Sequence, residues 1–209
     1  LTIPFNDFGF YRETSFTYKE IPRKEQICFI GYYQSWKYFW DVKEKVFEHI
    51  MPGFDVLGLK GMKKTDIVPV GSVAIHIRRG DYLDENFQNI FPSVGMDYIK
   101  KAVNFFTKKG YYSFSVYSED IAWCKEAIRN DPEFCDRSFF FMEAKSKDPV
   151  KDDLFDFYTM SLHDHQIISN STYSLWAAML NTNPDKMIVC PHEDIFFGPQ
   201  VPDLGDWYE

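Results

Sequence analysis

From Gly71 onward, short apolar runs alternate with segments that have the periodicity of amphipathic helices. The predicted elements follow in this order: strand 72–78, helix 96–109, strand 112–117, helix 121–130, strand 139–142, helix 153–162, strand 166–169, helix 172–180 and strand 187–190. Strands that alternate with helices are typical of an α/β protein with a parallel sheet covered on both faces. Ligands bind such sheets beyond the carboxyl ends of the strands, so the residues after each strand deserve the closest reading.

The first 70 residues have a different pattern. A polar opening is followed by a short aromatic strand at residues 28–33 and an aromatic-rich helix at residues 36–50. Met51-Pro52-Gly53 is expected to end that helix, and residues 58–69 form a polar connector to the regular part. The pattern therefore divides the chain into residues 1–69 and residues 70–209.

Composition narrows the class of protein. Of 209 residues, 45% are hydrophobic and 26% are charged, which argues against intrinsic disorder. The net charge of −8 argues against sequence-nonspecific binding of nucleic acid, because such binding needs a surface that neutralises phosphates. No apolar run approaches the ~18 residues of a membrane-spanning helix. The chain starts at Leu1 without an initiator Met and without a signal peptide, which indicates a lost or trimmed N-terminus.

The cysteines show neither the CxxC pattern nor the spacing of a zinc site. They are predicted to be free, buried thiols, and a bridge between Cys124 and Cys135 is the alternative. His163-Asp164-His165 is a weak metal-binding signal, because no further ligand accompanies it in the sequence. No metal site is therefore predicted.

The first regular strand ends in a basic pair, Arg78-Arg79, followed by Gly80 and Asp81. Side chains alternate along a strand, so His76 and Arg78 share the face opposite Val73, Ile75 and Ile77. Guanidinium groups match phosphate oxygens, and a glycine allows close backbone approach, so this strand end predicts a phosphate site. The alternative is a structural ion pair between either arginine and Asp81, and spacing alone does not decide between the two.

Two further strand ends carry polar groups. Ser118-Glu119-Asp120 opens a helix, where one side chain caps the helix and another carboxylate remains to accept from a base edge such as that of guanine. Residues 169–174 open the helix at 172–180, where backbone N–H groups and hydroxyls form an anion site or a plain cap. Together the three strand ends could hold the pyrophosphate and base of a nucleotide. No GxGxxG or GxxxxGKS/T motif is present, which disfavours dehydrogenases and P-loop enzymes.

These segments resemble a known family. Residues 73–82 look like the HxRRGDY motif of the α-1,2-fucosyltransferases, glycosyltransferase family 11, and residues 117–125 resemble its FSDDxxWCK motif. Residues 153–180 are similar to its long motif DxxLMSxCxHxIIANSxFSWWxAxL, and residues 32–39 to its GYFQSxKYF stretch. The chain departs from the family at Glu119, where Asp is usual, at Leu175, where Trp is usual, and in a missing Cys. It also lacks the glycine-rich GxGNQxFQ opening.

The resemblance implies a GT-B fold with two Rossmann-like lobes. Residues 70–209 would be the lobe that holds GDP-fucose, and residues 1–69 the remnant of the acceptor-side lobe. It implies transfer of L-fucose from GDP-fucose to the 2-hydroxyl of a terminal galactose in a glycan. The transfer would invert the sugar configuration and would need neither a metal nor another cofactor.

The resemblance also assigns residues. Arg78 matches the arginine that meets the β-phosphate. The chemistry of transfer also needs a group that takes the acceptor proton, for which Asp81 is the candidate base, and orientation of Arg78 or Arg79 is the preferred role for Asp81. The residues expected to contact the donor are His76, Arg78, Arg79, Ser118, Glu119, Asp120, Asn170, Ser171, Thr172 and Tyr173.

Two other functions stay open at this point. One is a fucosyltransferase of another linkage, and the other is a non-catalytic GDP-sugar-binding or scaffold protein, because the glycine-rich opening is absent. No nucleic-acid partner is expected, and peripheral association with a membrane is compatible with the family. A bacterial enzyme would work in the cytoplasm or at the cytoplasmic membrane face, and an animal enzyme at the Golgi membrane.

Overall fold

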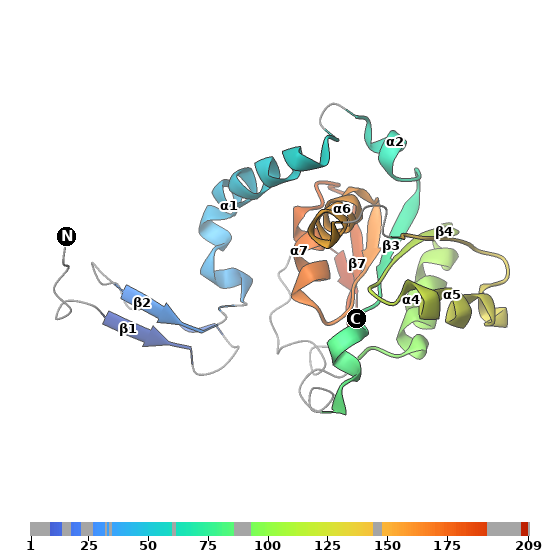
Figure 1. Ribbon diagram of the computed structural model, residues 1–209, viewed down its shortest axis with the longest axis horizontal. Coiled ribbons are helices and arrows are strands. Elements are labelled where there is room, and N and C mark those ends of the chain that lie inside the picture. Colours follow the sequence, from blue (N-terminus) through green and yellow to red (C-terminus); the bar gives the residue numbers. More distant parts are fainter. Residues whose placement is uncertain are drawn as a thin grey trace.

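The computed structural model describes residues 9–13, 18–21, 27–31, 33, 35–59, 62–85, 93–143, 148–191 and 206–208; the side chains of Trp36, Asp81 and residues 206–208 lie outside this description. In the described part, six parallel strands form the central sheet in the order β5-β4-β3-β6-β7-β8 (Figure 1). Their bounds are β3 Ser72–His76, β4 Ser113–Tyr117, β5 Ser138–Phe141, β6 His165–Ile167, β7 Met187–Val189 and β8 Asp206–Tyr208.

Helices cover both faces of this sheet (Figure 1). On one face, Val73, Ile75 and Ile77 pack into a core with α4 (Met96–Lys108) and α5 (Ile121–Arg129). On the other face, Ala74 packs with residues of α6 (Pro149–Leu162) and α7 (Thr172–Leu180). The predicted alternation of faces along the first regular strand is therefore confirmed, and it directs His76 toward the side of α7.

The N-terminal part forms an arm beside the sheet. Strands β1 (Gly9–Arg12) and β2 (Ile27–Ile30) make a two-stranded parallel ribbon that projects away from the body in Figure 1. The chain then runs through η2 (Trp36–Tyr38), η3 (Trp40–Val42), α1 (Lys43–Ile50), η4 (Met51–Leu57) and α2 (Lys64–Ile67) to β3. Phe39 stacks on Trp176 of α7 with ring centroids 4.9 Å apart, and Phe54 stacks on Phe157 of α6 at 5.8 Å. These aromatic contacts hold the arm against α6 and α7.

Three features of this arm differ from the prediction. The helix expected at residues 36–50 is broken into η2, η3 and α1, because the backbones of Phe39 (φ −129°) and Val42 (φ −124°) leave the helical region. Helix α1 ends before Met51-Pro52-Gly53, as predicted, but helical structure continues from there as the 3-10 helix η4. It ends where Gly58 takes a left-handed conformation (φ 67°). Strand β1 lies in a segment that looked merely polar.

The regular part follows the prediction closely. Each predicted strand and helix is present, and most boundaries agree to within two residues. The exception is α6, which begins at Pro149 rather than at residue 153, with the Asp148 side chain accepting from the Val150 N–H. An acidic N-cap followed by proline is a strong start signal for a helix. Strand β8 was not predicted.

The four cysteines are free, as predicted, but only two of them are buried. Cys124 and Cys190 lie in the core, whereas Cys28 and Cys135 are exposed, which corrects the expectation of four buried thiols. None of the helices in the described part of the chain combines the length and apolar character that crossing a bilayer requires.

Candidate nucleotide-sugar site

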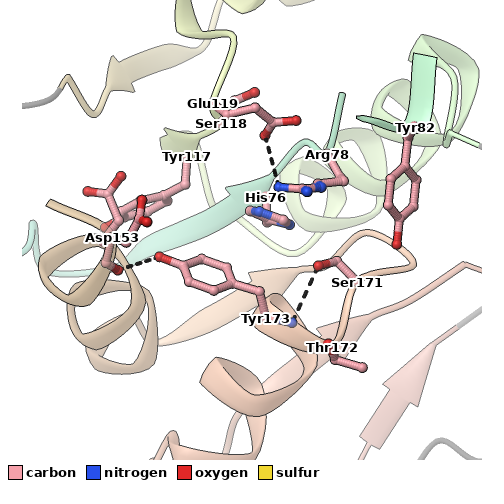
Figure 2. A pocket seen from close by; sticks show the side chains of 11 residues that line it. His76, Arg78, Tyr82, Tyr117, Ser118, Glu119, Asp153, Ser171, Thr172 and Tyr173 are labelled. Carbon is pink, nitrogen blue, oxygen red and sulfur yellow. Dashed lines mark hydrogen bonds and ion pairs between the residues drawn. The ribbon is translucent and has the colours of Figure 1, made fainter. Parts of the chain in front are cut away.

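The candidate site lies where the strand order reverses. The chain proceeds from β3 to β4 and β5 on one side, and from β6 to β7 and β8 on the other, while β3 and β6 pair with each other. The connections after these two strands diverge, which leaves a crevice at their carboxyl ends. A cavity of about 410 Å³ opens there, lined by His76, Arg78, Tyr82, Tyr117, Ser118, Glu119, Asp153, Asp156, Ser171, Thr172 and Tyr173 (Figure 2).

His76 forms part of the floor of this cavity. It is the last residue of β3 and is 5% exposed, with Nδ1 2.7 Å from Ser169 Oγ and its ring 5.5 Å from that of Tyr173. Burial, and then the nearby charge of Arg78, lower the pKa of His76 to about 3. The imidazole is therefore neutral at physiological pH and acts as a hydrogen-bonding group rather than as a cation.

Arg78 supplies the positive charge of the cavity. Its side chain is half-buried, Nη1 lies 3.9 Å from Glu119 Oε2, and the guanidinium carbon lies 5.5 Å from the centre of the Tyr82 ring. Tyr82 is held in turn by its hydroxyl, which donates to the backbone oxygen of Asn170 at 3.0 Å. Glu119 and Tyr82 therefore restrict the position of the Arg78 guanidinium, which faces the cavity.

Arg79 has a different role from its neighbour. Its Nε donates to Asp120 Oδ2 at 3.1 Å, and its guanidinium lies 3.6 Å from the centre of the Trp123 ring. Asp120 also caps α5 by accepting from the Trp123 N–H at 3.2 Å. The ion-pair partner of Arg79 is thus Asp120. The alternative considered from the sequence, an ion pair of either arginine with Asp81, concerns a side chain outside the described residues.

Glu119 is the carboxylate of the second strand end that faces the cavity. Its Oε1 accepts from the Arg79 N–H at 2.5 Å, and Gly80 (φ +26°) makes room for it, because a β-carbon at Gly80 would lie 3.0 Å from that oxygen. The expected division of labour therefore holds, since Asp120 caps the helix and Glu119 lines the cavity. The Glu119 carboxylate is thus engaged by the Arg79 backbone N–H and lies 3.9 Å from the Arg78 guanidinium.

The N-terminus of α7 forms another wall of the cavity, after the ends of β3 and β4. The Ser171 hydroxyl accepts from the Tyr173 N–H at 3.3 Å, and Ser171, Thr172 and Tyr173 all line the cavity. The N–H groups of a first helical turn and the helix dipole attract anions. Asn170 is buried and supports Tyr82 through its backbone oxygen, so it stands behind this wall rather than in it.

Sequence reasoning missed four residues of the lining. Tyr82 and Tyr117 stand beside predicted site residues, and their position at the ends of the motifs was the signal that could have found them. Asp153 and Asp156 come from α6 instead. Asp156 coincides with the first Asp of the motif DxxLMS, which was the signal that could have found it, whereas Asp153 has no such signal. Both residues reach the cavity because α6 packs on α7, where the ring centroids of Phe157 and Tyr173 are 5.2 Å apart and the Tyr173 hydroxyl donates to the Asp153 backbone oxygen.

With the geometry described, the chain can be compared with known proteins. The model of Glycosyl transferase family 11 matches residues 4–196. The chain belongs to this family. Family 11 relatives include the O-antigen biosynthesis glycosyltransferase WbnK of Escherichia coli, 28% identical over 176 residues, which are 81% of this chain and 56% of the relative.

Two further relatives of this family 11 chain have names that state a linkage. The α-1,2-colitosyltransferase of Escherichia coli is 28% identical over 171 residues, 80% of this chain and 56% of the relative. The galactoside α-(1,2)-fucosyltransferase 2 of Rattus norvegicus is 27% identical over 191 residues, 85% of this chain and 50% of the relative. The chain spans about half the length of the curated relatives it matches.

The histidine pair of this family 11 chain has structural partners. His163 is buried between Tyr117, whose hydroxyl is 2.9 Å from Nε2, and Ser72, whose hydroxyl is 2.6 Å from Nδ1. Asp164 pairs with Lys64, and His165 Nδ1 accepts from the Met187 N–H. Among the described residues, no group of three or more His, Cys, Asp or Glu side chains is arranged to hold a metal ion.

Proposed function

We propose that this chain carries the donor site of a fucosyltransferase that transfers L-fucose from GDP-fucose to the 2-hydroxyl of a terminal galactose, with inversion and without a metal ion. The observation that carries the proposal is the convergence of Arg78 and the α7 N-terminus on one cavity at the switch point of the sheet. Within a chain of net charge −8, Arg78 and the backbone N–H groups at the start of α7 are the donors of this cavity that suit an anion.

The diphosphate would lie between Arg78 and the first turn of α7, at Ser171 and Thr172. The guanidinium offers a fork of donors that fits phosphate oxygens, and the helix start offers backbone N–H groups. Neutral His76, on the floor between them, would donate or accept one hydrogen bond without adding charge. Glu119 and Ser118 would accept from the N–H groups of guanine.

These groups also account for catalysis of bond cleavage. When the bond between fucose C1 and the diphosphate breaks, negative charge grows on the departing oxygen while C1 becomes oxocarbenium-like. Donors that already point at this oxygen stabilise the transition state without reorganisation. Arg78 and the α7 N-terminus are such donors, and Arg79, Asp120 and Trp123 hold the loop that carries Arg78 in place.

A second donor follows from one relative. The bacterial α-1,2-colitosyltransferase matches this chain with an identity similar to that of the fucosyltransferases, which supports colitose as an alternative sugar. The diphosphate and guanine contacts would be the same for both sugars. Binding of GDP therefore does not distinguish a fucose donor from a colitose donor, and turnover with each sugar nucleotide does.

We also propose the two-lobe arrangement that the family implies. Residues 70–209 would form the donor lobe of a GT-B enzyme, and residues 1–69 would belong to the acceptor-side lobe. The acceptor would be a galactose-terminated glycan. The site of action would be the cytoplasm or cytoplasmic membrane face in a bacterium, or the Golgi membrane in an animal, with peripheral membrane association.

The test begins with calorimetric titration of the protein with GDP, with ADP and UDP as controls. Saturable binding of GDP alone supports the donor site, and equal binding of all three or none contradicts it. Transfer from GDP-fucose and GDP-colitose to a β-galactoside is then measured, with the product linkage determined by NMR. An α-1,2 product supports the proposal, another linkage favours a related fucosyltransferase, and GDP binding without turnover favours the non-catalytic protein.

A further inference from the structure

Charged side chains stand at both ends of the cavity. Arg78, its partner Glu119, Tyr82 and the first turn of α7 stand at one end, and Asp153 of α6 stands at the other, with His76 and Tyr173 between them (Figure 2). Asp156 lines the same cavity and lies one helical turn after Asp153, so both side chains share one face of α6. The proposed donor contacts involve the end with Arg78 and Glu119 and do not involve the two aspartates.

Asp156 is the inner carboxylate of the two. It is half-buried, whereas Asp153 is exposed at the rim. Asp156 precedes Asp153 among the charges that, after burial, raise the pKa of Tyr173, and it also contributes to the raised pKa of Tyr117. The Asp156 carboxylate therefore acts electrostatically on both Tyr173 and Tyr117, which line the cavity.

Other acidic residues serve the N-terminus of helix α6. Asp148 caps its N-terminus, and Asp152 supplies an acidic residue in the first turn, where the helix dipole favours one. Asp156 stands half-buried in the middle of the helix and lines the cavity. The Tyr173 hydroxyl and Phe157 fasten α6 to the start of α7, so the α6 carboxylates are held at a fixed place relative to Arg78.

We propose that Asp156 is the group that takes the proton of the acceptor hydroxyl and that Asp153 binds a neighbouring hydroxyl of the acceptor sugar. This inference rests on the proposed function and deepens it. Inversion by a single displacement requires the incoming oxygen and the leaving diphosphate on opposite sides of C1. Arg78 at one end of the cavity and the α6 carboxylates at the other provide that arrangement.

The step balances as follows. The galactose 2-hydroxyl oxygen forms a bond to fucose C1 while the bond from C1 to the β-phosphate oxygen breaks, and GDP leaves with the electron pair of that bond. The hydroxyl proton moves to the Asp156 carboxylate, which becomes neutral and returns the proton to water after the product leaves. Asp153 accepts a hydrogen bond from a second hydroxyl and fixes the orientation of the acceptor.

The test compares Asp156→Asn, Asp153→Ala and the control Asp152→Asn in the protein. The control removes the same charge from the same helix at a position outside the cavity lining. Asp156→Asn is expected to lower kcat for transfer about 10²–10⁴-fold, the usual contribution of a general base. GDP affinity should remain that of the parent, and Asp156→Glu should restore part of the rate. Asp153→Ala should raise KM for the galactoside about tenfold, and Asp152→Asn should change neither constant.

A second readout does not depend on turnover. In the presence of GDP, titration by saturation-transfer NMR should give the same dissociation constant for methyl β-galactoside with the parent and with Asp152→Asn, and a dissociation constant about tenfold higher with Asp153→Ala. Transfer by Asp156→Asn at the parent rate, or unchanged galactoside binding by Asp153→Ala, would overturn the inference and leave the donor assignment intact. A parent that binds no GDP would instead refute the proposed function, and the inference would fall with it.

Discussion

The guanidinium of Arg78 lies 3.9 Å from the carboxylate of Glu119, across the carboxyl ends of β3 and β4. The proposed ligand contacts would separate this pair, because a diphosphate competes for the arginine and a guanine for the glutamate. Both side chains are about one-third exposed, so water screens their attraction and the exchange of partners costs little. The pair would keep the two side chains near their ligand positions.

Arg78→Ala should weaken GDP binding about 10- to 100-fold, because it removes a charge-assisted contact with phosphate. The measurement is calorimetric titration with GDP. Arg129→Ala is the matched control, since that arginine lies on α5, away from the cavity, with its guanidinium 5.6 Å from the Phe141 ring centre. Equal GDP affinity in parent and Arg78→Ala would refute the phosphate assignment.

Arg79→Ala should act mainly on stability. The change removes the contact with Trp123 and the hydrogen bond to Asp120, and we expect a loss of about 1–2 kcal/mol in the free energy of unfolding. Urea unfolding followed by tryptophan fluorescence measures this loss. A variant as stable as the parent would show that the stacking is not energetically important.

Glu119→Gln should reduce discrimination between GDP and IDP. Inosine lacks the 2-amino group of guanine, so a carboxylate that accepts from this group makes the parent prefer GDP. The amide is a weaker acceptor than the carboxylate, and the ratio of the two dissociation constants should move toward one. If the parent binds GDP and IDP equally, Glu119 only supports the loop through the Arg79 N–H.

Acid should destabilise the fold through its buried histidines. Burial lowers the pKa of both His76 and His163 from the ordinary 6.5 to about 3, so the unfolded chain binds protons that the folded chain does not. Their contribution to stability is complete above pH 6.5 and is lost as the pH falls toward 3, by about 1.4 kcal/mol per pH unit for each histidine. His163→Gln should flatten this slope in urea unfolding at pH 4 to 7, and an unchanged slope would contradict the shift.

Chelation should leave activity unchanged. The proposed mechanism places Arg78 and the α7 N-terminus where other glycosyltransferases could use a divalent cation, so fucose transfer with EDTA should equal transfer without it. Loss of activity that Mg²⁺ or Mn²⁺ restores would refute the metal-free part of the proposal.

Local sequence patterns predicted most of the sheet and much of the cavity lining. Alternation along the first regular strand placed His76 and Arg78 opposite the core residue Ile75. The sequence 118–120 predicted one cap and one remaining carboxylate, and the structure makes Asp120 the cap and leaves Glu119 for the cavity. These outcomes follow from the geometry of a single strand or a single helix start, which neighbouring residues determine.

The remaining features depend on tertiary packing. Alternation puts Arg78 on the side of His76, but the partners that hold Arg79 away from the cavity, Asp120 and Trp123, come from the packing of α5. Asp153 and Asp156 enter the lining because α6 docks on α7, a contact that no local pattern encodes. The broken helix at residues 36–50 likewise reflects the stacking of Phe39 on Trp176, far along the chain.

The pairing of β3 with β6 also determines when the site can exist during folding. These strands are neighbours in the sheet, but α4, β4, α5, β5 and α6 separate them in the chain. Closing so long a loop is slow, so local contacts among β3, α4 and β4 can form first. Arg78 and the α7 N-terminus meet only after β6 docks, and brief separation of β3 from β6 would abolish donor binding in a chain that keeps most of its secondary structure.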